Sequence, residues 1–241
     1  MAKLHDSWTV LPHGSVRELD ERLVTVEGVI PMPLGKFPRR MTVIGLSRGR
    51  SAIFSAIALG EAAMRKVEQV GAPAFLIVPN GHHRLDTRAW KGRYPKIRVL
   101  CPPGAKTAVD EAVKVDATTN VFGDKAVRFE VVDGTGRGEA ALVVRRKAGT
   151  TLILNDVLAN VGHPKGLGAK VMARLFGFGV KRPQVPRVVK KMLVDDAAAL
   201  ARQFRAWADD EQLRRIIVSH GDVIDREPRR VLREIADALD S

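Results

Sequence analysis

The sequence is poor in cysteine and has no long apolar run. Its one cysteine, Cys101, rules out a disulfide within the chain, so we expect a cytoplasmic protein. Cys101 ends an apolar run, and we interpret it as a buried strand residue because free cysteine usually packs as a small hydrophobe. No segment approaches the roughly 20 apolar residues of a membrane span, and the first residues lack the apolar core of a signal peptide. We therefore expect no transmembrane segment.

Several common catalytic signatures are also missing. There is no Walker motif, and Gly134, Gly136 and Gly138 are too sparse for a nucleotide-binding loop. No Gly-x-Ser-x-Gly elbow is present, and the adjacent residues Ser219 and His220 cannot easily form a triad-like hydrogen bond. These absences argue against a P-loop nucleotidase and against a serine hydrolase of the common type.

Acidic residues are outnumbered by basic ones. The chain has 40 Lys and Arg against 27 Asp and Glu, and its formal net charge of +13 predicts an anionic partner. Residues 162–194 hold eight Lys or Arg and no acidic residue, and we interpret them as a basic helical insertion. This insertion is either a solvated basic surface or the rim of a site for an anionic small molecule, with Lys165, Lys170 and Arg174 as candidate anion-binding residues.

Two other partners are compatible with this charge. The insertion mixes lysines with apolar residues, which suits a peripheral contact with an anionic membrane. Nucleic acid is the other, and it would be bound mostly through its phosphates in a salt-sensitive way. Aromatic residues make up only 5% of the chain, so surfaces for base stacking are few and nucleic acid is the less favoured partner.

The spacing of apolar residues predicts strands and helices in mixed order. We expect strands at residues 23–30, 41–46, 51–59, 75–78, 97–100, 126–132, 140–145, 151–154 and 216–218. We expect helices at residues 60–70, 86–93, 104–115, 195–211 and 227–239, and a loop at residues 32–38. This order indicates two sheets packed face to face with helices outside, in a single domain spanning residues 1–241.

Polar side chains follow three of the expected strands at their carboxyl ends. One strand is followed by His82, His83 and Asp86, another by Asp156 and the last by His220. Strand ends that lead into polar loops are where proteins of this kind place metal ligands and catalytic groups. The recurrence predicts one site assembled from distant parts of the chain.

The order of these parts resembles the metallo-β-lactamase fold superfamily, from about Trp8 to Leu239. Three anchors carry the resemblance: the loop Val78-Pro-Asn-Gly-His-His-Arg-Leu85 in place of the family's His-x-His-x-Asp-His loop, the strand that ends in Asp156, and His220 before the last helix. The resemblance implies an α+β fold, a four-layer αββα sandwich of two mixed β-sheets with helices outside. It also implies a metal site for zinc, or for iron or manganese.

The chain departs from the family motif at several ligand positions. His82, Asp156 and His220 keep the ligand type, whereas the motif's other ligand positions hold Asn80, Arg84 and Leu85, and Thr135 replaces its middle histidine. In the family His82 and His220 would serve different metals with Asp156 between them, so the resemblance implies a reduced site. His83 and Asp86 are the additional candidate ligands, because a catalytic zinc normally needs three protein ligands and an open position.

Two functions remain open from the sequence. In the first, the protein is a metal-dependent hydrolase acting on an anionic small molecule, with Asp156 as its catalytic residue and a metal that polarises a carbonyl or phosphoryl group and activates water. In the second, it is a non-catalytic binding module for an anion, a lipid surface or nucleic acid. The fixed charge of Arg84 favours an anion in that case, and a fold alone does not decide between the two.

Overall fold

The first sheet has six strands in sequence order, β1-β2-β3-β4-β5-β6. The computed structural model describes residues 4–32, 35–162 and 182–240. The strands are β1 (Arg17–Asp20), β2 (Leu23–Met32), β3 (Gly35–Gly45), β4 (Arg50–Phe54), β5 (Ala72–Ile77) and β6 (Arg98–Leu100). The first four pair antiparallel, whereas β4, β5 and β6 run parallel. The carboxyl ends of β4 and β5 therefore lie at the same edge of this sheet.

The second sheet has four strands in the order β10-β9-β8-β7. They are β7 (Val127–Val131), β8 (Ala140–Arg146), β9 (Gly149–Leu154) and β10 (Leu213–Val218). β7, β8 and β9 pair antiparallel, and β9 and β10 run parallel. The loops that follow β9 and β10 consequently leave the sheet side by side, which brings residues 155–160 next to residues 219–222.

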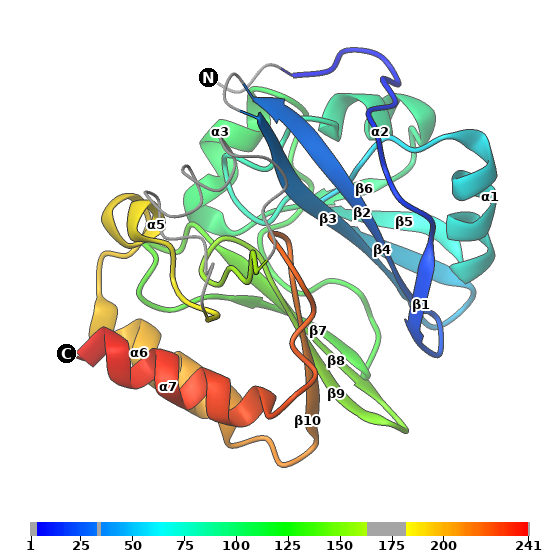
Figure 1. The fold of residues 1–241 in the computed structure, drawn as a ribbon. Coiled ribbons are helices and arrows are strands. Elements are labelled where there is room, and N and C mark those ends of the chain that lie inside the picture. The colour runs from blue at the N-terminus through cyan, green and yellow to red at the C-terminus, as the bar shows by residue number, and fades with distance from the viewer. Residues whose placement is uncertain (1–3, 33–34, 163–181, 241) are drawn as a thin grey trace.

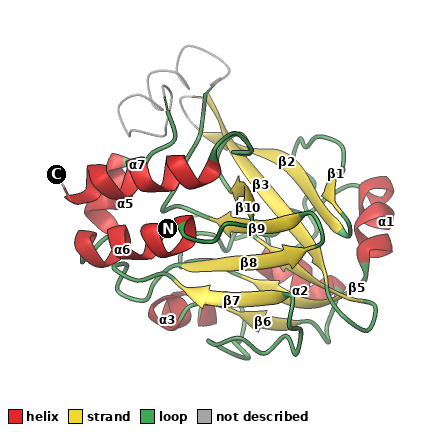
Figure 2. Cartoon of the chain, turned by 90° about the horizontal axis from the view of Figure 1, so that it is seen from below, coloured by secondary structure: helices red, strands yellow, loops and turns green. Residues whose placement is uncertain are grey.

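Helices cover the outer face of each sheet, which gives four layers (Figures 1 and 2). On the first sheet lie α1 (Glu61–Val70), α2 (Thr87–Arg93), the short η1 (Pro103–Ala105) and α3 (Lys106–Asp110). On the second lie α6 (Ala197–Ala208) and α7 (Pro228–Asp240), while α5 (Arg187–Met192) stands beside them. Three clusters of buried apolar residues fill the two helix–sheet interfaces and the space between the sheets. The architecture is the αββα sandwich of two mixed sheets expected from the sequence.

The loop expected at residues 32–38 is wrong, because β2 and β3 continue through most of it as a long hairpin. Pro31 pairs with Lys36 and Pro38 with Val29. Proline lacks a backbone N–H and is tolerated where that group would face an open edge. β1 pairs with β2 only as far as Thr25, and β4 pairs with β3 only from Thr42, so both prolines face such edges.

The helix expected at residues 104–115 is shorter than its apolar spacing indicates. After η1, α3 ends at Asp110. The Asp110 carboxylate accepts a hydrogen bond from the backbone N–H of Val115 at 2.9 Å, which closes the chain into a turn. A short acidic side chain that bonds the backbone in this way competes with helix continuation.

The other expected elements are present with shifted ends. α6 begins after Asp196, which caps the helix because its side chain accepts a hydrogen bond from the backbone N–H of Ala199 at 2.9 Å. Cys101 is buried, as expected. Residues 162 and 182–194 of the basic insertion fall within the described residues and contain α5, whereas Lys165, Lys170 and Arg174 lie outside them. No helix in the described ranges is long and apolar enough to cross a membrane.

Candidate metal centre

Asn80 organises the loop that follows β5. Its side-chain oxygen accepts hydrogen bonds from the backbone N–H groups of His82 at 2.8 Å and His83 at 3.1 Å. Its Nδ2 donates to the carboxylates of Glu139 at 2.8 Å and Asp156 at 2.7 Å. Asn80 is only 1% exposed, so these four bonds form in a buried setting where each strongly restricts the loop. The loop is thereby tied to the second sheet.

Three potential ligand atoms converge where the loops after β5, β9 and β10 meet. Asp156 Oδ1 lies 3.2 Å from His83 Nε2 and 3.0 Å from His220 Nε2, and the two Nε2 atoms are 3.1 Å apart. Ligands held at about 2.0–2.1 Å from a tetrahedral zinc ion lie roughly 3.3 Å from one another. The three atoms therefore already stand close to the spacing that a bound cation requires.

The second nitrogen of each histidine has a partner that orients the ring. His220 Nδ1 lies 2.8 Å from the carbonyl oxygen of Pro38, which can only accept, so His220 donates from Nδ1. In the neutral ring its Nε2 then carries a lone pair directed at Asp156. His83 Nδ1 lies 3.0 Å from Ser55 Oγ, a hydroxyl that can accept a hydrogen bond from this nitrogen. Metal-binding histidines are typically oriented through their second nitrogen.

Without a cation this arrangement brings lone pairs together. Neutral His83 and His220, with protons on Nδ1, would both aim an unshared pair at a carboxylate oxygen that also only accepts. Either additional protons or a metal ion must offset this repulsion. Burial lowers the pKa of His83, although Asp156 opposes that effect, so the neutral ligand form of this ring is favoured. The donor set thus fits a divalent metal.

Asp156 and Glu139 are two carboxyls with opposite pKa shifts. Burial raises the pKa of Asp156, but the neighbouring His83 and His220 outweigh it and hold the pKa well below its usual range. Burial and the nearby charge of Asp156 raise the pKa of Glu139 well above its usual range. Asp156 is consequently the ionised member of the pair and the anionic ligand, while Glu139 tends to keep its proton.

Glu139 is a site residue that the sequence analysis missed. It is fully buried at the start of β8, and its Oε1 accepts from the backbone N–H of Asp156 at 2.7 Å. Its other oxygen accepts from Asn80. The sequence offered one signal for Glu139: it is a single acidic residue directly before the apolar run of β8. Burying an unpaired carboxylate there would be energetically unfavourable, so a partner could have been expected. Glu139 supports both the Asn80 loop and the Asp156 backbone.

Ser55 is the other missed residue. It follows β4 with a φ of 54°, in the left-handed region that non-glycine residues rarely adopt. Such strained positions gather at functional sites and cost about 1–3 kcal/mol each. Here the turn directs the Ser55 hydroxyl to His83 Nδ1. In the sequence, Ser55 is one small residue within the apolar run 51–59, and nothing there distinguishes it as a site residue.

Solved structures with the same architecture were found across nearly the whole chain. The metallo-β-lactamase DIM-1 superposes with a TM-score of 0.61 at 11% identity, covering 95% of this chain and 99% of that one. The metallo-β-lactamase FIM-1 from Pseudomonas aeruginosa, in its mono-zinc form, gives 0.61 at 10% identity and covers 95% and 96%. A metallo-β-lactamase from Erythrobacter litoralis, with β-mercaptoethanol in its active site, gives 0.61 at 15% identity and covers 95% and 100%.

The chain has the metallo-β-lactamase fold. No protein-family model matches the sequence, and no curated protein matches it either. At such low identities the likeness establishes the fold alone. The residues at the metal position must therefore be judged from their own geometry.

Within the metallo-β-lactamase fold, His83 rather than His82 joins Asp156 and His220 among the described residues. His82 is exposed, whereas the side chain of His83 is 12% exposed and faces the cluster. The two backbone bonds to Asn80 turn the loop so that the second histidine points inward. Alignment on the family motif had selected His82, one residue away.

Asp86 and Arg84 are engaged elsewhere. The buried carboxylate of Asp86 pairs with Arg39 and lies 2.9 Å from His5 Nδ1, on the helix-covered side of the first sheet. Arg84 donates to the Ala108 carbonyl and pairs with Glu111 at 2.6 Å, next to α3. The structure thus places neither residue in the cluster, and Arg84 already has its anionic partner.

Replacing Ser55 with alanine should weaken metal binding without unfolding the chain. The hydroxyl that orients the His83 ring would be lost, and removal of such a partner typically costs about 10–100-fold in metal affinity. Zinc affinity measured by competition with a chromophoric chelator checks this. Ser47→Ala, an exposed serine after β3, is the matched control and should leave the affinity unchanged. Equal affinities in wild type and Ser55→Ala would contradict the assigned role.

Proposed function

We propose that the protein is a metal-dependent hydrolase that holds one metal ion with His83, Asp156 and His220 and acts on an anionic small molecule. The main support for this proposal is that His83 Nε2, Asp156 Oδ1 and His220 Nε2 all lie within about 3.2 Å of one another. Two histidines and one carboxylate leave open positions for water and substrate, as catalytic sites require.

The donor set supports zinc and also admits iron or manganese. Two imidazole nitrogens and a carboxylate suit zinc, and the same combination forms the usual triad of non-haem iron sites. A single ion is supported by the number of ligands, because three residues offer one ligand atom each, and Asp156 Oδ2 already accepts a hydrogen bond from Asn80 Nδ2. The mono-zinc form of FIM-1 is a precedent for one zinc in this fold.

Each residue of the site has a role in this proposal. A bound metal would supply the Lewis acidity that polarises a carbonyl or phosphoryl oxygen and activates water. Asp156 presents Oδ1 to His83 and His220, while Asn80 and Glu139 hold its other oxygen and its backbone. The Pro38 carbonyl keeps neutral His220 in the tautomer that leaves Nε2 available, and Ser55 orients the His83 ring through its Nδ1. Asp156 is thus the proposed catalytic ligand.

The positions flanking the basic insertion support an anionic substrate. A β-bridge pairs Ala159, before the insertion, with Gln184, within its described part. The next residue, Asn160, forms a second β-bridge with Gly221, the residue after His220. Gly221 has a φ of 107°, and a Cβ there would lie 2.0 Å from the Asn160 carbonyl oxygen, so the approach requires glycine. The described residues Ala159 and Gln184 therefore lie close to His220, and the eight cations of residues 162–194 belong to the chain between and after them.

Metal stoichiometry is the decisive measurement. Wild type purified without chelator should contain about one metal per chain by elemental analysis, and His83→Ala and His220→Ala should contain almost none, because a site reduced to two ligands binds poorly. His82→Ala is the matched control and should keep its metal, since this ring is exposed. Loss of metal in His82→Ala but not in His83→Ala would refute the assignment.

A screen of hydrolysable anions tests the reaction itself. Phosphate monoesters, phosphodiesters and carboxylate-bearing lactones and thioesters present the carbonyl or phosphoryl groups that a single metal can polarise. Activity should depend on the metal and disappear in His83→Ala. Full metal occupancy without turnover of any such compound would favour the binding module over the hydrolase.

A further inference from the structure

A basic surface lies around α5 and includes none of the proposed metal ligands. It comprises Arg182, Arg187, Lys190 and Lys191, all exposed. None of the four forms an ion pair with another residue in the described part of the chain, whereas arginines elsewhere, such as Arg93 and Arg205, are paired with carboxylates. Four unpaired cations within ten residues create a local positive potential that attracts anions.

An apolar side chain stands among these cations. Met192, the last residue of α5, is 66% exposed, and no residue of α5 is buried. Large apolar side chains with this exposure are few in the described structure, where Val10 at 48% is the other example. A short helix that presents lysines and an exposed methionine, and that contributes nothing to the core, matches the composition of interfacial segments.

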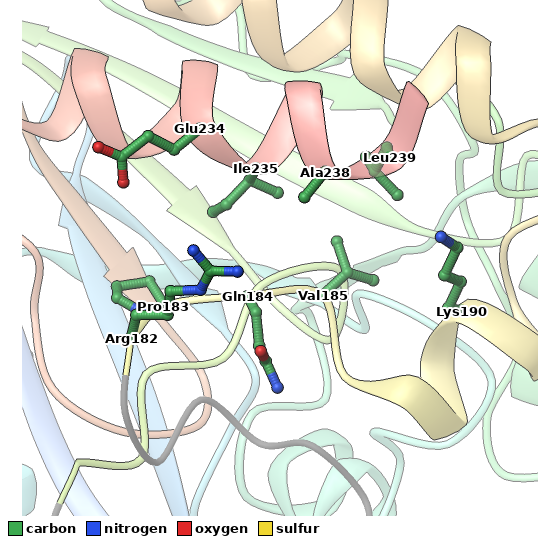
Figure 3. Close-up of a pocket in the computed structure, with 9 residues that line it drawn as sticks. All are labelled: Arg182, Pro183, Gln184, Val185, Lys190, Glu234, Ile235, Ala238 and Leu239. Carbon is green, nitrogen blue, oxygen red and sulfur yellow. The ribbon is translucent and has the colours of Figure 1, made fainter. Parts of the chain in front are cut away.

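A groove adjoins the same cations (Figure 3). It runs between α7 and residues 182–190, and Val185, Ile235, Ala238 and Leu239 supply apolar lining. Arg182 and Lys190 flank it, while Glu234 on its rim pairs with Arg230 at 3.2 Å. Its volume of about 160 Å³ is comparable to a cavity that admits a benzene-sized group, so it suits a short apolar segment and not a whole substrate.

We propose that the basic surface and this groove dock the protein on an anionic phospholipid bilayer. The four cations would contact lipid phosphates, Met192 would enter the interface, and the groove would receive the end of an acyl chain. Nucleic acid fits less well, because residues 182–194 contain no aromatic side chain for base stacking and an apolar groove has no role there. The docking would bring the proposed hydrolase to an anionic surface independently of its metal.

Vesicle co-sedimentation of the full chain tests the proposal. Vesicles of phosphatidylcholine with phosphatidylglycerol should bind the protein, and vesicles of phosphatidylcholine alone should not. Each Lys near such a surface contributes about 1 kcal/mol, about fivefold in affinity, so Lys190→Glu/Lys191→Glu should weaken binding by at least about 25-fold. Arg65→Glu/Lys66→Glu, on the exposed face of α1 across the molecule (Figure 1), carries the same charge change and should weaken it far less.

The Met192→Ser variant distinguishes binding to a lipid surface from binding to other polyanions, because it removes an apolar contact without changing the charge. It should weaken binding to phosphatidylglycerol vesicles several-fold and leave binding to a DNA duplex unchanged. α5 has no buried residue, so these variants should unfold at the wild-type temperature. Equal losses in both double variants would overturn the proposal, as would an unchanged Met192→Ser affinity for vesicles or retention by DNA but not by vesicles.

Discussion

Asp156→Asn is expected to abolish metal binding and hydrolysis together while the chain stays folded. The substitution removes the anionic ligand, so metal affinity should fall by more than the roughly 10–100-fold typical of outer partners. The amide can keep its oxygen toward Asn80 and direct its NH₂ group at the Nε2 atoms of His83 and His220, which lie 3.2 Å and 3.0 Å away from Oδ1. Those nitrogens would gain a donor in place of a repelling carboxylate.

The comparison needs metal content, activity and unfolding temperature on the same samples. Asp222→Asn is the matched control, since it removes one negative charge two residues from His220 on an exposed side chain. The control should retain both metal and activity. Metal retained at one ion per chain in Asp156→Asn would show that this carboxylate is not a ligand.

Glu139→Leu is expected to produce the largest loss of stability among the site variants. The backbone N–H of Asp156 and the Nδ2 of Asn80 would lose their buried acceptor, at about 1–3 kcal/mol for each unsatisfied donor. Denaturant unfolding of the metal-free protein measures the loss. Glu211→Leu, at an exposed position, should change the free energy of unfolding by no more than about 0.5 kcal/mol. Similar effects of the two substitutions would contradict the buried role of Glu139.

The raised pKa of Glu139 also predicts a pH dependence of stability. Burial and Asp156 raise the pKa in the folded state, so the folded protein binds a proton that the unfolded chain has lost. This contribution is fully present below the unfolded pKa of about 4.3 and is lost as pH rises toward the folded pKa. The slope attributable to one such proton is at most about 1.4 kcal/mol per pH unit.

Glu139→Gln removes this titration while keeping one acceptor. The difference in free energy of unfolding between wild type and Glu139→Gln should therefore shift steadily in favour of the variant as pH rises above about 4.3. Metal-free samples are required, because a bound cation would change the charge beside Asp156. A difference that stays constant with pH would mean that Glu139 is already ionised in the folded protein.

Apolar periodicity in the sequence was sufficient to predict most of the elements. In the helix predicted at residues 195–211, Leu200, Phe204 and Trp207 form one apolar face, and this face is buried against the second sheet as expected of an amphipathic helix. The hairpin of β2 and β3 was missed since Pro31 and Pro38 read as breaks, and only the sheet order reveals that both face unpaired edges. The local sequence pattern does not show which strand edges are left unpaired in the sheet.

The location of the candidate site could be predicted from the sequence, whereas the full set of residues that form it could not. Asp156 and His220 follow apolar strands whose parallel pairing brings their ends together, and this could be expected from sequence. Which of the adjacent residues His82 and His83 faces inward depends on the hydrogen bonds of Asn80, which involve a different sheet. Glu139 and Ser55 carry no spacing signal at all, because their roles arise from long-range contacts with residues 17 and 28 positions away.

The proposed ligands come from both layers of strands: His83 follows β5 of the first sheet, and Asp156 and His220 follow β9 and β10 of the second. A cation shared by them would act as a reversible cross-link between the two halves of the sandwich, closing chain segments of 73 and 64 residues. Constraining such long segments restricts the unfolded chain, and binding only to the folded state adds stability that grows with the logarithm of free metal concentration. Resistance to unfolding would then depend on the concentration of free metal in the cell, and so would the lifetime of the folded chain.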